Sequence, residues 1–362
     1  MTTVASVLAE LNRRAPGDKA AAWDPHGLQI GDPTMEVLRL AVCHEVTDQV
    51  VGKAIDLEVD LLVTYHPLLF KPITRLVAGP GPSGRAYDLV RGGVAVGTVH
   101  TAWDAAGGGT AAALATTLGL KSPRGFGVID PAPITKLVTF VPPSAVENVA
   151  RALTEAGAGQ IGNYSGCSFR VEGTGTFVPD RGAKPTVGKI GEVSEEPEVR
   201  LELVVPKPLE ARVVAALRAT HPYEEPAFDL QEVRSNLGLI GRVGNLEVPL
   251  ALGKFSDRVV EMLNSRVRCS GDQSQVVTRV AIVPGSGGSF VPEAAGADAD
   301  VYITGDLSHH DTRAALDLGM STIDPGHAAT ERPGVVELMS LASTILPDVV
   351  DLVEDATPWK EN

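Results

Sequence analysis

The sequence predicts an α/β fold, a core domain of two α/β halves interrupted by an α+β insert. Apolar strand-like segments alternate with helix-like segments before residue 130 and again after residue 236. This alternation is typical of an α/β layer with a largely parallel sheet. Between these flanks the pattern changes to strand-helix, strand-helix, strand. Since neither flank alone has enough predicted strands for a finished sheet, one domain interrupted by another is the economical interpretation.

The first half of the core covers residues 1–130. Its helices are predicted from apolar positions at helical spacing, and Pro16 with Gly17 ends the first one. Gly119 is suited to end the last one. The predicted helices are 2–16, 47–59 and 109–120, and the predicted strands are 37–46, 60–66 and 94–101. Strands and helices thus alternate along the whole half.

The insert covers residues 134–233 and follows a Pro-rich stretch, "VIDPAPITKL", that could be a linker. Its middle, 161–198, is rich in Gly, Pro and Thr, which indicates loops or a hairpin. The predicted strands are 136–142, 198–206 and 227–233, and the predicted helices are 144–159 and 208–222. These elements predict a compact α+β domain.

The second half of the core covers residues 236–362. Three segments in which a strand leads into a turn or helix carry the α/β pattern: 277–289, 299–319 and 320–346. In the last one, "DPGHAATE" predicts the start of a helix after a strand and a Gly turn. We expect Pro333 to stop or bend this helix early.

Charge and composition exclude some functions. The 362-residue chain has a net charge of −14, which argues against nucleic acid as a partner because phosphate binding needs a basic face. No stretch reaches about 18 apolar residues, so no membrane span is expected. The three cysteines form no CxxC pattern, and the N-terminus has Glu10 inside its apolar part. We therefore expect reduced thiols, no signal peptide and a cytoplasmic location.

Five of the eight histidines lie where an apolar strand gives way to a turn or helix: His66, His100, His309, His310 and His327. The carboxyl ends of parallel strands meet at one edge of a sheet, where sites tend to form. Asp104 follows His100 by four residues, and Glu331 follows His327 by four, the spacing that places two ligands on one helix face. A single histidine of this kind is more often structural, but three such clusters favour a metal site. Mixed imidazole and carboxylate ligands suit zinc, iron, manganese or cobalt better than calcium.

Several neighbouring residues have two interpretations. Asp24 and His100 could orient metal ligands, or be a capping residue and a structural histidine. The turn "PGSGGS" (284–289) could hold a phosphate through backbone N–H groups, although a plain Gly-rich turn is favoured. The segment "HPYEE" (221–225) is more typical of a cap and turn than of a metal site.

Five stretches together carry a family resemblance: "WDPHGLQIGD", "TYHPLLF", "HTAWDAAGGG", "ITGDLSHHD" and "DPGHAATE". With them, the chain resembles the NIF3 family, whose bacterial members are often named GTP cyclohydrolase I type 2 homologs. The middle of the chain, with "HPYEEPAFD", resembles the ferredoxin-like PII/CutA-like insert of the long members. The resemblance implies a NIF3-like core and a ring-shaped (toroidal) homohexamer.

The resemblance also implies a dinuclear centre with one or two divalent metal ions per subunit. Its ligands would be His66, Asp104, His327 and Glu331, and in the family the counterpart of Glu331 bridges the two metals. Tyr65 stands where the family usually has a second histidine. A phenol is a poorer neutral ligand than imidazole, so Tyr65 is either a weak ligand or a hydroxyl donor beside the metals.

The predicted site has one more difference from relatives and two candidate catalytic residues. His44 and Glu45 stand where relatives usually have Leu and Asp, and Glu45 is a candidate to replace that carboxylate. His100 and His310 are the candidate catalytic residues, which would assist proton transfer.

Two functions are compatible with these features. The first is a metal-dependent hydrolase that acts on a small phosphorylated or nucleotide-like substrate. The second is a metal-holding regulatory or ligand-binding hexamer with PII-like sensor inserts and no turnover.

Overall fold

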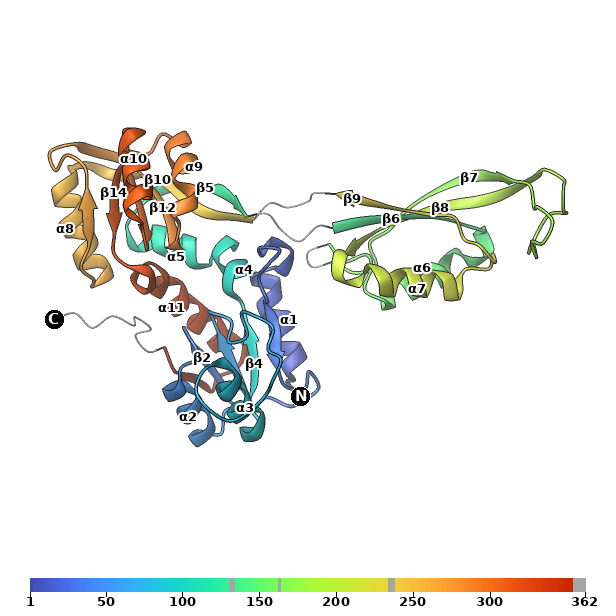
Figure 1. Cartoon of the computed structure of the whole chain (residues 1–362), viewed down its shortest axis with the longest axis horizontal. Coiled ribbons are helices and arrows are strands. Elements are labelled where there is room, and N and C mark those ends of the chain that lie inside the picture. Colours follow the sequence, from blue (N-terminus) through green and yellow to red (C-terminus); the bar gives the residue numbers. More distant parts are fainter. Residues whose placement is uncertain (130–133, 162–163, 234–237, 354–362) are drawn as a thin grey trace. The chain divides into compact units, whose positions relative to one another are not determined.

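The computed structural model describes residues 1–129, 134–161, 164–233 and 238–353 (Figure 1). The chain forms two compact units, a core unit of residues 1–131 and 237–362 and an insert unit of residues 132–236. Residues 130–133 of the predicted Pro-rich linker lie outside the described residues, and the rest of it belongs to the end of β5 and the start of β6.

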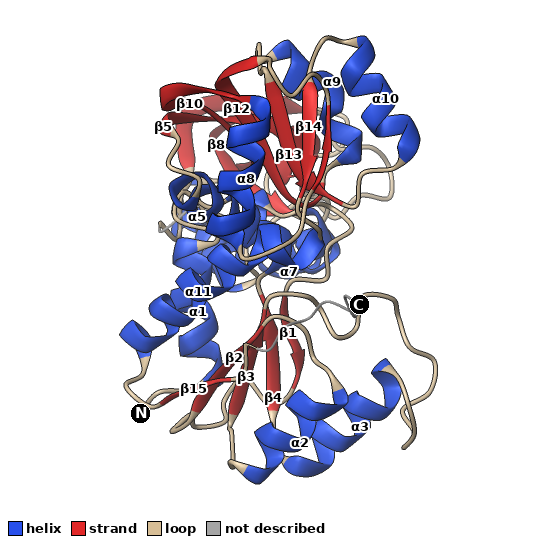
Figure 2. Ribbon diagram, turned by 90° about the vertical axis from the view of Figure 1, so that its left-hand side faces the viewer, coloured by secondary structure: helices blue, strands red, loops and turns tan. Residues whose placement is uncertain are grey.

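The core unit contains two sheets (Figure 2). The first has the strand order β1-β4-β3-β2-β15, and its β2, β3, β4 and β15 run parallel while β1 is antiparallel. These strands are β1 (Gly27–Ile30), β2 (Leu40–Cys43), β3 (Leu61–Thr64), β4 (Ala95–Thr98) and β15 (Val349–Asp351). Strands β2, β3 and β4 are buried along their whole length, which is why they appear as continuous apolar runs.

The second sheet has the strand order β11-β14-β13-β12-β10-β5, with β12, β13 and β14 parallel to one another. Its strands are β5 (Lys121–Ile129), β10 (Gly238–Ala251), β11 (Arg268–Ser270), β12 (Val276–Ser286), β13 (Val301–Gly305) and β14 (Ser321–Asp324). The mixed α/β architecture predicted from the sequence is thus present as two separate sheets.

Helices cover both faces of each sheet. The first sheet packs on one face against α1 (Val4–Arg14), α4 (His100–Ala105) and α11 (His327–Ile345), and on the other against α2 (Asp48–Asp56) and α3 (Pro82–Gly92). The second sheet packs against α5 (Thr110–Thr117) and α8 (Leu252–Leu263) on one face and α9 (Val291–Gly296) and α10 (His309–Asp317) on the other. Each sheet therefore has its own core on either side.

The two halves of the core exchange strands. Strand β5 belongs to the first half of the sequence but pairs with β10 in the second sheet. Strand β15 belongs to the second half but pairs with β2 in the first sheet. The sequence boundaries at 1–130 and 236–362 therefore do not separate the sheets, because each sheet is completed by a strand from the other half.

Helix α11 connects the two sheets (Figure 2). Ala329 near its start packs in the core of the second sheet, whereas Val335 and Leu338 pack in the core of the first. Of the two effects expected of Pro333, to stop or to bend this helix, the first is wrong, since the helix continues to Ile345. Residues on both sides of Pro333 are buried, and this packing outweighs the helical hydrogen bond that the proline cannot donate.

The insert unit is a sheet of order β7-β8-β6-β9 with two helices between its strands. Its elements are β6 (Ile134–Val141), α6 (Val146–Glu155), β7 (Phe169–Phe177), β8 (Ser194–Pro206), α7 (Glu210–Thr220) and β9 (Phe228–Val233). This βαββαβ order is the ferredoxin-like arrangement. The hairpin expected within 161–198 is formed by β7 and β8.

None of the helices in the described residues is both long and apolar enough to cross a membrane.

Because α11 packs in both cores, the stability of the core unit is expected to depend on the buried side chains of this helix. Leu338 is fully buried, so Leu338→Ala is expected to lower the free energy of unfolding by about 2–5 kcal/mol. Val336 is exposed on the same helix and supplies the control. Val336→Ala is expected to change the free energy of unfolding by less than about 0.5 kcal/mol. Urea unfolding measures both, and equal effects of the two changes would contradict this packing.

Candidate metal centre

The carboxyl ends of β2, β3 and β4 lie at one edge of the first sheet, since these strands are parallel. His44 follows β2, Tyr65 and His66 follow β3, and His100 begins α4 directly after β4. Helix α11 brings His327 and Glu331 to the same place. Local sequence thus places each of these side chains at a strand or helix end, and the sheet brings them together.

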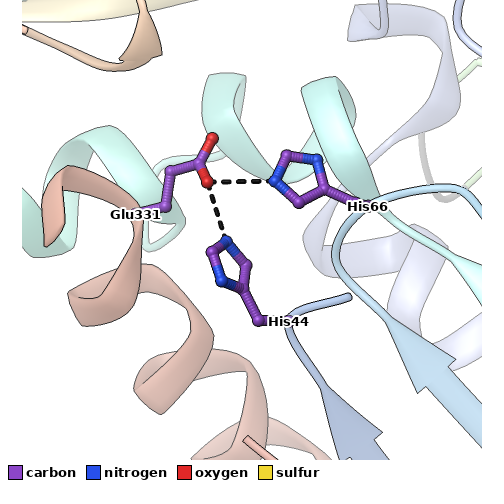
Figure 3. Close-up of side chains that lie close together, drawn as sticks. All are labelled: His44, His66 and Glu331. Carbon is purple, nitrogen blue, oxygen red and sulfur yellow. Dashed lines mark hydrogen bonds and ion pairs between the residues drawn. The ribbon is translucent and has the colours of Figure 1, made fainter. Parts of the chain in front are cut away.

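The buried carboxylate of Glu331 is the centre of this cluster, with only 3% of the residue exposed. Its Oε2 accepts hydrogen bonds from Nε2 of His44 (2.7 Å) and of His66 (3.0 Å), and both rings point at it in Figure 3. Its Oε1 lies 3.0 Å from Nε2 of His327, one helical turn earlier in α11. Three imidazoles from three chain segments therefore surround one carboxylate.

These contacts set the charges of the cluster. Burial alone would raise the pKa of Glu331, but hydrogen bonds from His327, His44 and His66 hold it well below its usual range. Burial would likewise lower the pKa of His327, yet its contacts with Glu331 and Asp306 raise it to about 9. Asp306 contributes through Oδ2, 2.7 Å from Nδ1 of His327. Without a metal ion, an ionised Glu331 is held by an imidazolium.

Tyr65 is a hydroxyl donor to a second carboxylate. Its buried O–H donates to Asp104 Oδ1 (2.5 Å) and lies 3.4 Å from Glu331 Oε1. Burial and the negative charges of Asp104 and Glu331 raise the pKa of Tyr65 well above its usual value. Burial also raises the pKa of Asp104, to about 6. Of the two roles predicted for Tyr65, the geometry favours the hydroxyl donor.

Asp24 orients His100. Asp24 Oδ1 lies 2.9 Å from His100 Nδ1, and Oδ2 accepts from the backbone N–H (2.9 Å) and the hydroxyl of Thr101. Burial opposes ionisation, but the contacts with His100 and Thr101 hold the pKa of Asp24 below its usual value. The same ion pair raises the pKa of His100 against the effect of burial. Asp24 therefore fixes the ring of His100 and accepts an N–H in the first turn of α4, as a capping residue does. The alternative that Asp24 and His100 orient metal ligands stays a prediction.

The donor set fits a divalent metal ion. One ligand atom each from His44, His66 and Glu331 lie within 4.8 Å of one another. Two further groups lie on the side of the other carboxylate oxygen, Glu331 Oε1. His327 contacts this oxygen directly, and Asp104 is linked to it through the hydroxyl of Tyr65. Imidazole nitrogens and carboxylate oxygens are the ligands that zinc, iron, manganese and cobalt accept.

Two cavities open at the cluster. One of about 460 Å³ is lined by Asp104, Glu331, His66, His100 and His327 together with apolar side chains. The other, of about 1280 Å³, is lined by His44, Glu45, His66, His100 and His327, among others. Because His66, His100 and His327 line both, a small molecule in either cavity reaches the candidate metal site.

Sequence reasoning missed two members of the cluster, His44 as a candidate ligand and Asp306 as the partner of His327. Both follow strands, β2 and β13, so the strand-end signal that identified His66 applied to them as well. Glu45, expected near the metals, is exposed and lines the larger cavity.

His310 is not brought to the cluster. The capping box between Ser308 and Asp311 starts α10 so that His309 and His310 occupy its exposed first turn. The centroids of their rings lie 5.5 Å apart. Neither residue is among the described residues that line the two cavities. A position after a strand therefore does not by itself bring a histidine to this cluster, and the catalytic role expected of His310 stays a prediction.

Two other motifs make hydrogen bonds within the fold. In "PGSGGS", the backbone N–H groups of Gly285 and Gly287 donate to the hydroxyls of Thr330 (2.8 Å) and Thr304 (2.9 Å), so they do not point at a ligand. In "HPYEE", His221 Nε2 bonds the Phe140 carbonyl and its Nδ1 accepts from the Tyr223 N–H. These contacts agree with the turn interpretation of both motifs.

Residues 2–354 match the family model described as Duf34/NIF3 (NGG1p interacting factor 3). The chain belongs to the NIF3 family. Two curated relatives named GTP cyclohydrolase 1 type 2 homolog are each 38% identical to it. The match to the relative from Bacillus subtilis covers 87% of this chain and 85% of the relative. The match to the relative from Mycobacterium tuberculosis covers 91% of this chain and 88% of the relative. The crystal structure of a Bacillus cereus protein related to NIF3 matches with a TM-score of 0.66, 31% identity and 99% coverage of both chains. A Staphylococcus aureus protein matches with a TM-score of 0.67 and 28% identity over 100% of this chain and 99% of the other.

The charge state of His327 predicts how the stability of the metal-free NIF3 chain depends on pH. The pKa of His327 is about 9 in the folded chain against an ordinary 6.5. Because the folded-state value is higher, protonated His327 stabilises the fold fully below pH 6.5, and this contribution is lost as the pH rises to about 9. Urea unfolding with a chelator is expected to show this decline in the wild type and a smaller one in His327→Gln. Parallel profiles would contradict the assignment.

Gly285 allows the backbone to approach the cluster. It has a φ of +66°, and a Cβ there would lie 2.5 Å from Glu331 Oε1 and 3.3 Å from His327 Nε2. We expect Gly285→Ala to weaken binding of Mn²⁺ or Zn²⁺ at least about 10-fold by displacing these groups, comparable to the loss of a residue that orients ligands. Equilibrium dialysis with the metal measures this.

Gly93 supplies the matched control. It has a φ of +72°, and a Cβ added there would have no neighbouring atom within 4 Å, so Gly93→Ala introduces the same backbone strain away from the cluster. Metal affinity is expected to stay at the wild-type value in this variant. If both variants bind metal as the wild type does, the Glu331 cluster is not the metal site.

Proposed function

We propose that this NIF3-family chain binds divalent metal at the Glu331 cluster and is a metal-dependent hydrolase of a small phosphorylated or nucleotide-like substrate. The observation that carries the proposal is one buried carboxylate contacted by the imidazoles of His44, His66 and His327. Its neighbourhood opens into a cavity of about 460 Å³, within the size range of small-molecule sites.

The two oxygens of Glu331 divide the proposed ligands. His44 and His66 contact Oε2, while His327 and, through Tyr65, Asp104 lie on the side of Oε1. We propose that these residues hold one or two ions of zinc, iron, manganese or cobalt, with Glu331 shared between them. When bound, such an ion supplies positive charge that polarises a phosphoryl or carbonyl oxygen.

His100 is the proposed proton-transfer residue. Its Nδ1 is bonded to Asp24, which fixes the ring and favours its protonated form. His100 lines both cavities, which supports a role for its ring in donating a proton to a leaving group there. Tyr65 and Asp306 have a different role, since they orient Asp104 and His327 through the hydrogen bonds described above.

We also propose a toroidal homohexamer and a PII/CutA-like role for the insert unit. The resemblance of the family motifs supports the assembly, and the ferredoxin-like strand order supports the character of the insert. Light scattering of the full chain tests the hexamer through its mass.

Metal content and turnover test the proposed function together. Elemental analysis of protein purified without chelators is expected to find one or two metal ions per subunit in the wild type and fewer in Glu331→Gln and His66→Ala. His310→Ala is the control, because His310 lies outside the cluster, and its metal content is expected to equal that of the wild type.

Turnover is measured on a panel of phosphoesters, nucleotides and cyclic amides with and without added manganese, zinc or iron. We expect metal-dependent hydrolysis by the wild type that falls at least about 100-fold in His100→Ala, the usual size of a lost acid-base group. If the wild type binds metal but no substrate turns over above a His327→Ala control, the chain is a metal-holding binding protein and the hydrolase proposal is wrong.

A further inference from the structure

Two exposed aromatic side chains stand beside the metal cluster. Trp23 is 62% exposed and Phe70 is 49% exposed, although both belong to the described core unit. Their rings pack edge to face with centroids 5.8 Å apart. Each also contacts the ring of His100, at 6.0 Å from Trp23 and 6.5 Å from Phe70. The three rings form one wall, which we call the aromatic wall.

The aromatic wall lines the smaller cavity. Asp104, Glu331, His66 and His327 supply the polar side of this cavity, and Val128, Ile129, Ile240 and Phe290 extend its apolar side. Val128 is itself 48% exposed. An apolar pocket with a few convergent polar groups is typical of a small-molecule site. Ser286 and Ser289 also line it and offer hydroxyls to the edge of a ligand.

The fold holds the wall in place without burying it. Asp24, the neighbour of Trp23, is buried and tied to His100 and Thr101, which fixes the chain at this point. Neither Trp23 nor Phe70 belongs to the hydrophobic cores formed by the described residues. Large apolar rings that are exposed and grouped indicate a binding surface more than a packing need.

We propose that Trp23 and Phe70 bind a planar heteroaromatic ring of the substrate, so that a substituent of that ring reaches the Glu331 cluster. The role assigned to that substituent rests on the proposed function, whereas ring binding requires no metal. Exposed aromatic faces bind any planar ring by stacking, and the two serines provide contacts for the polar edge of a base-like heterocycle. Trp23 and Phe70 are therefore specificity-determining residues that select ring-bearing over ring-free phosphates.

The test compares ligands that differ only in the ring. Calorimetric titration of the metal-free full chain uses the common ribonucleoside 5′-monophosphates and ribose 5-phosphate, which has the same sugar and phosphate but no base. At least one nucleotide is expected to bind about 10-fold or more tighter than ribose 5-phosphate, the effect of one stacked base. Trp23→Ala and Phe70→Ala are expected to remove most of this preference, and Trp23→Phe to keep part of it.

Three controls separate this proposal from a structural role and from the proposed function. Leu318→Ala removes an exposed apolar side chain elsewhere in the core unit and is expected to leave nucleotide binding unchanged. The metal content of Trp23→Ala and Phe70→Ala is expected to equal that of the wild type. Since binding is measured without metal, failure of the hydrolase proposal does not remove the expected nucleotide preference.

The ring-binding proposal is overturned if no nucleotide binds more tightly than ribose 5-phosphate. It is also overturned if the preference is the same in Trp23→Ala, Phe70→Ala and the wild type. Light scattering tests the alternative that the aromatic wall is a contact between copies of the chain. This alternative holds if Trp23→Ala lowers the mass of the assembly without changing nucleotide affinity.

Discussion

The buried carboxylate of Glu331 is the constraint around which the core unit is organised. An ionised carboxylate removed from water is costly unless hydrogen bonds and positive charge compensate it. His44 and His66 provide them from the ends of two strands, and His327 from the same helix as Glu331. Removing any one donor leaves the carboxylate less compensated, so its charge helps to hold the strand ends and the helix together in addition to the apolar cores.

The fold meets this constraint by placing α11 between two sheets. The first sheet contributes His44, Tyr65 and His66 from adjacent parallel strands, while the second contributes Asp306 from the end of β13 and Gly285 from β12. Glu331 is thus bonded from the first sheet and approached by Gly285 of the second, although it belongs to neither. A change in how the two sheets pack would alter the surroundings of the carboxylate, because the second sheet supplies Gly285 beside it and Asp306, which holds His327.

Much of this could be predicted from residues alone. Apolar runs that end in histidine identified His66, His100 and His327, because strand ends gather in an α/β layer. At His310 the same pattern did not lead into the cluster, since a capping box begins α10 there and leaves the residue on an exposed helix face. The role of Tyr65 depended on a 2.5 Å contact with Asp104, a residue 39 positions later, which no local pattern contains. The passage of α11 through Pro333 was likewise decided by tertiary packing, which overrides local propensity.

The exchange of strands between the halves has a consequence for synthesis of the chain. Strand β2 is made early, but its partner β15 follows roughly 300 residues later, so one edge of the first sheet stays open while most of the chain emerges. An unpaired edge strand is a template for association with other chains. The ferredoxin-like insert, whose strands pair only among themselves, can complete its sheet during this interval. The core must therefore close last, and a ribosome that stalls between residues 233 and 349 leaves a nascent chain whose insert strands are all made while β2 still lacks β15.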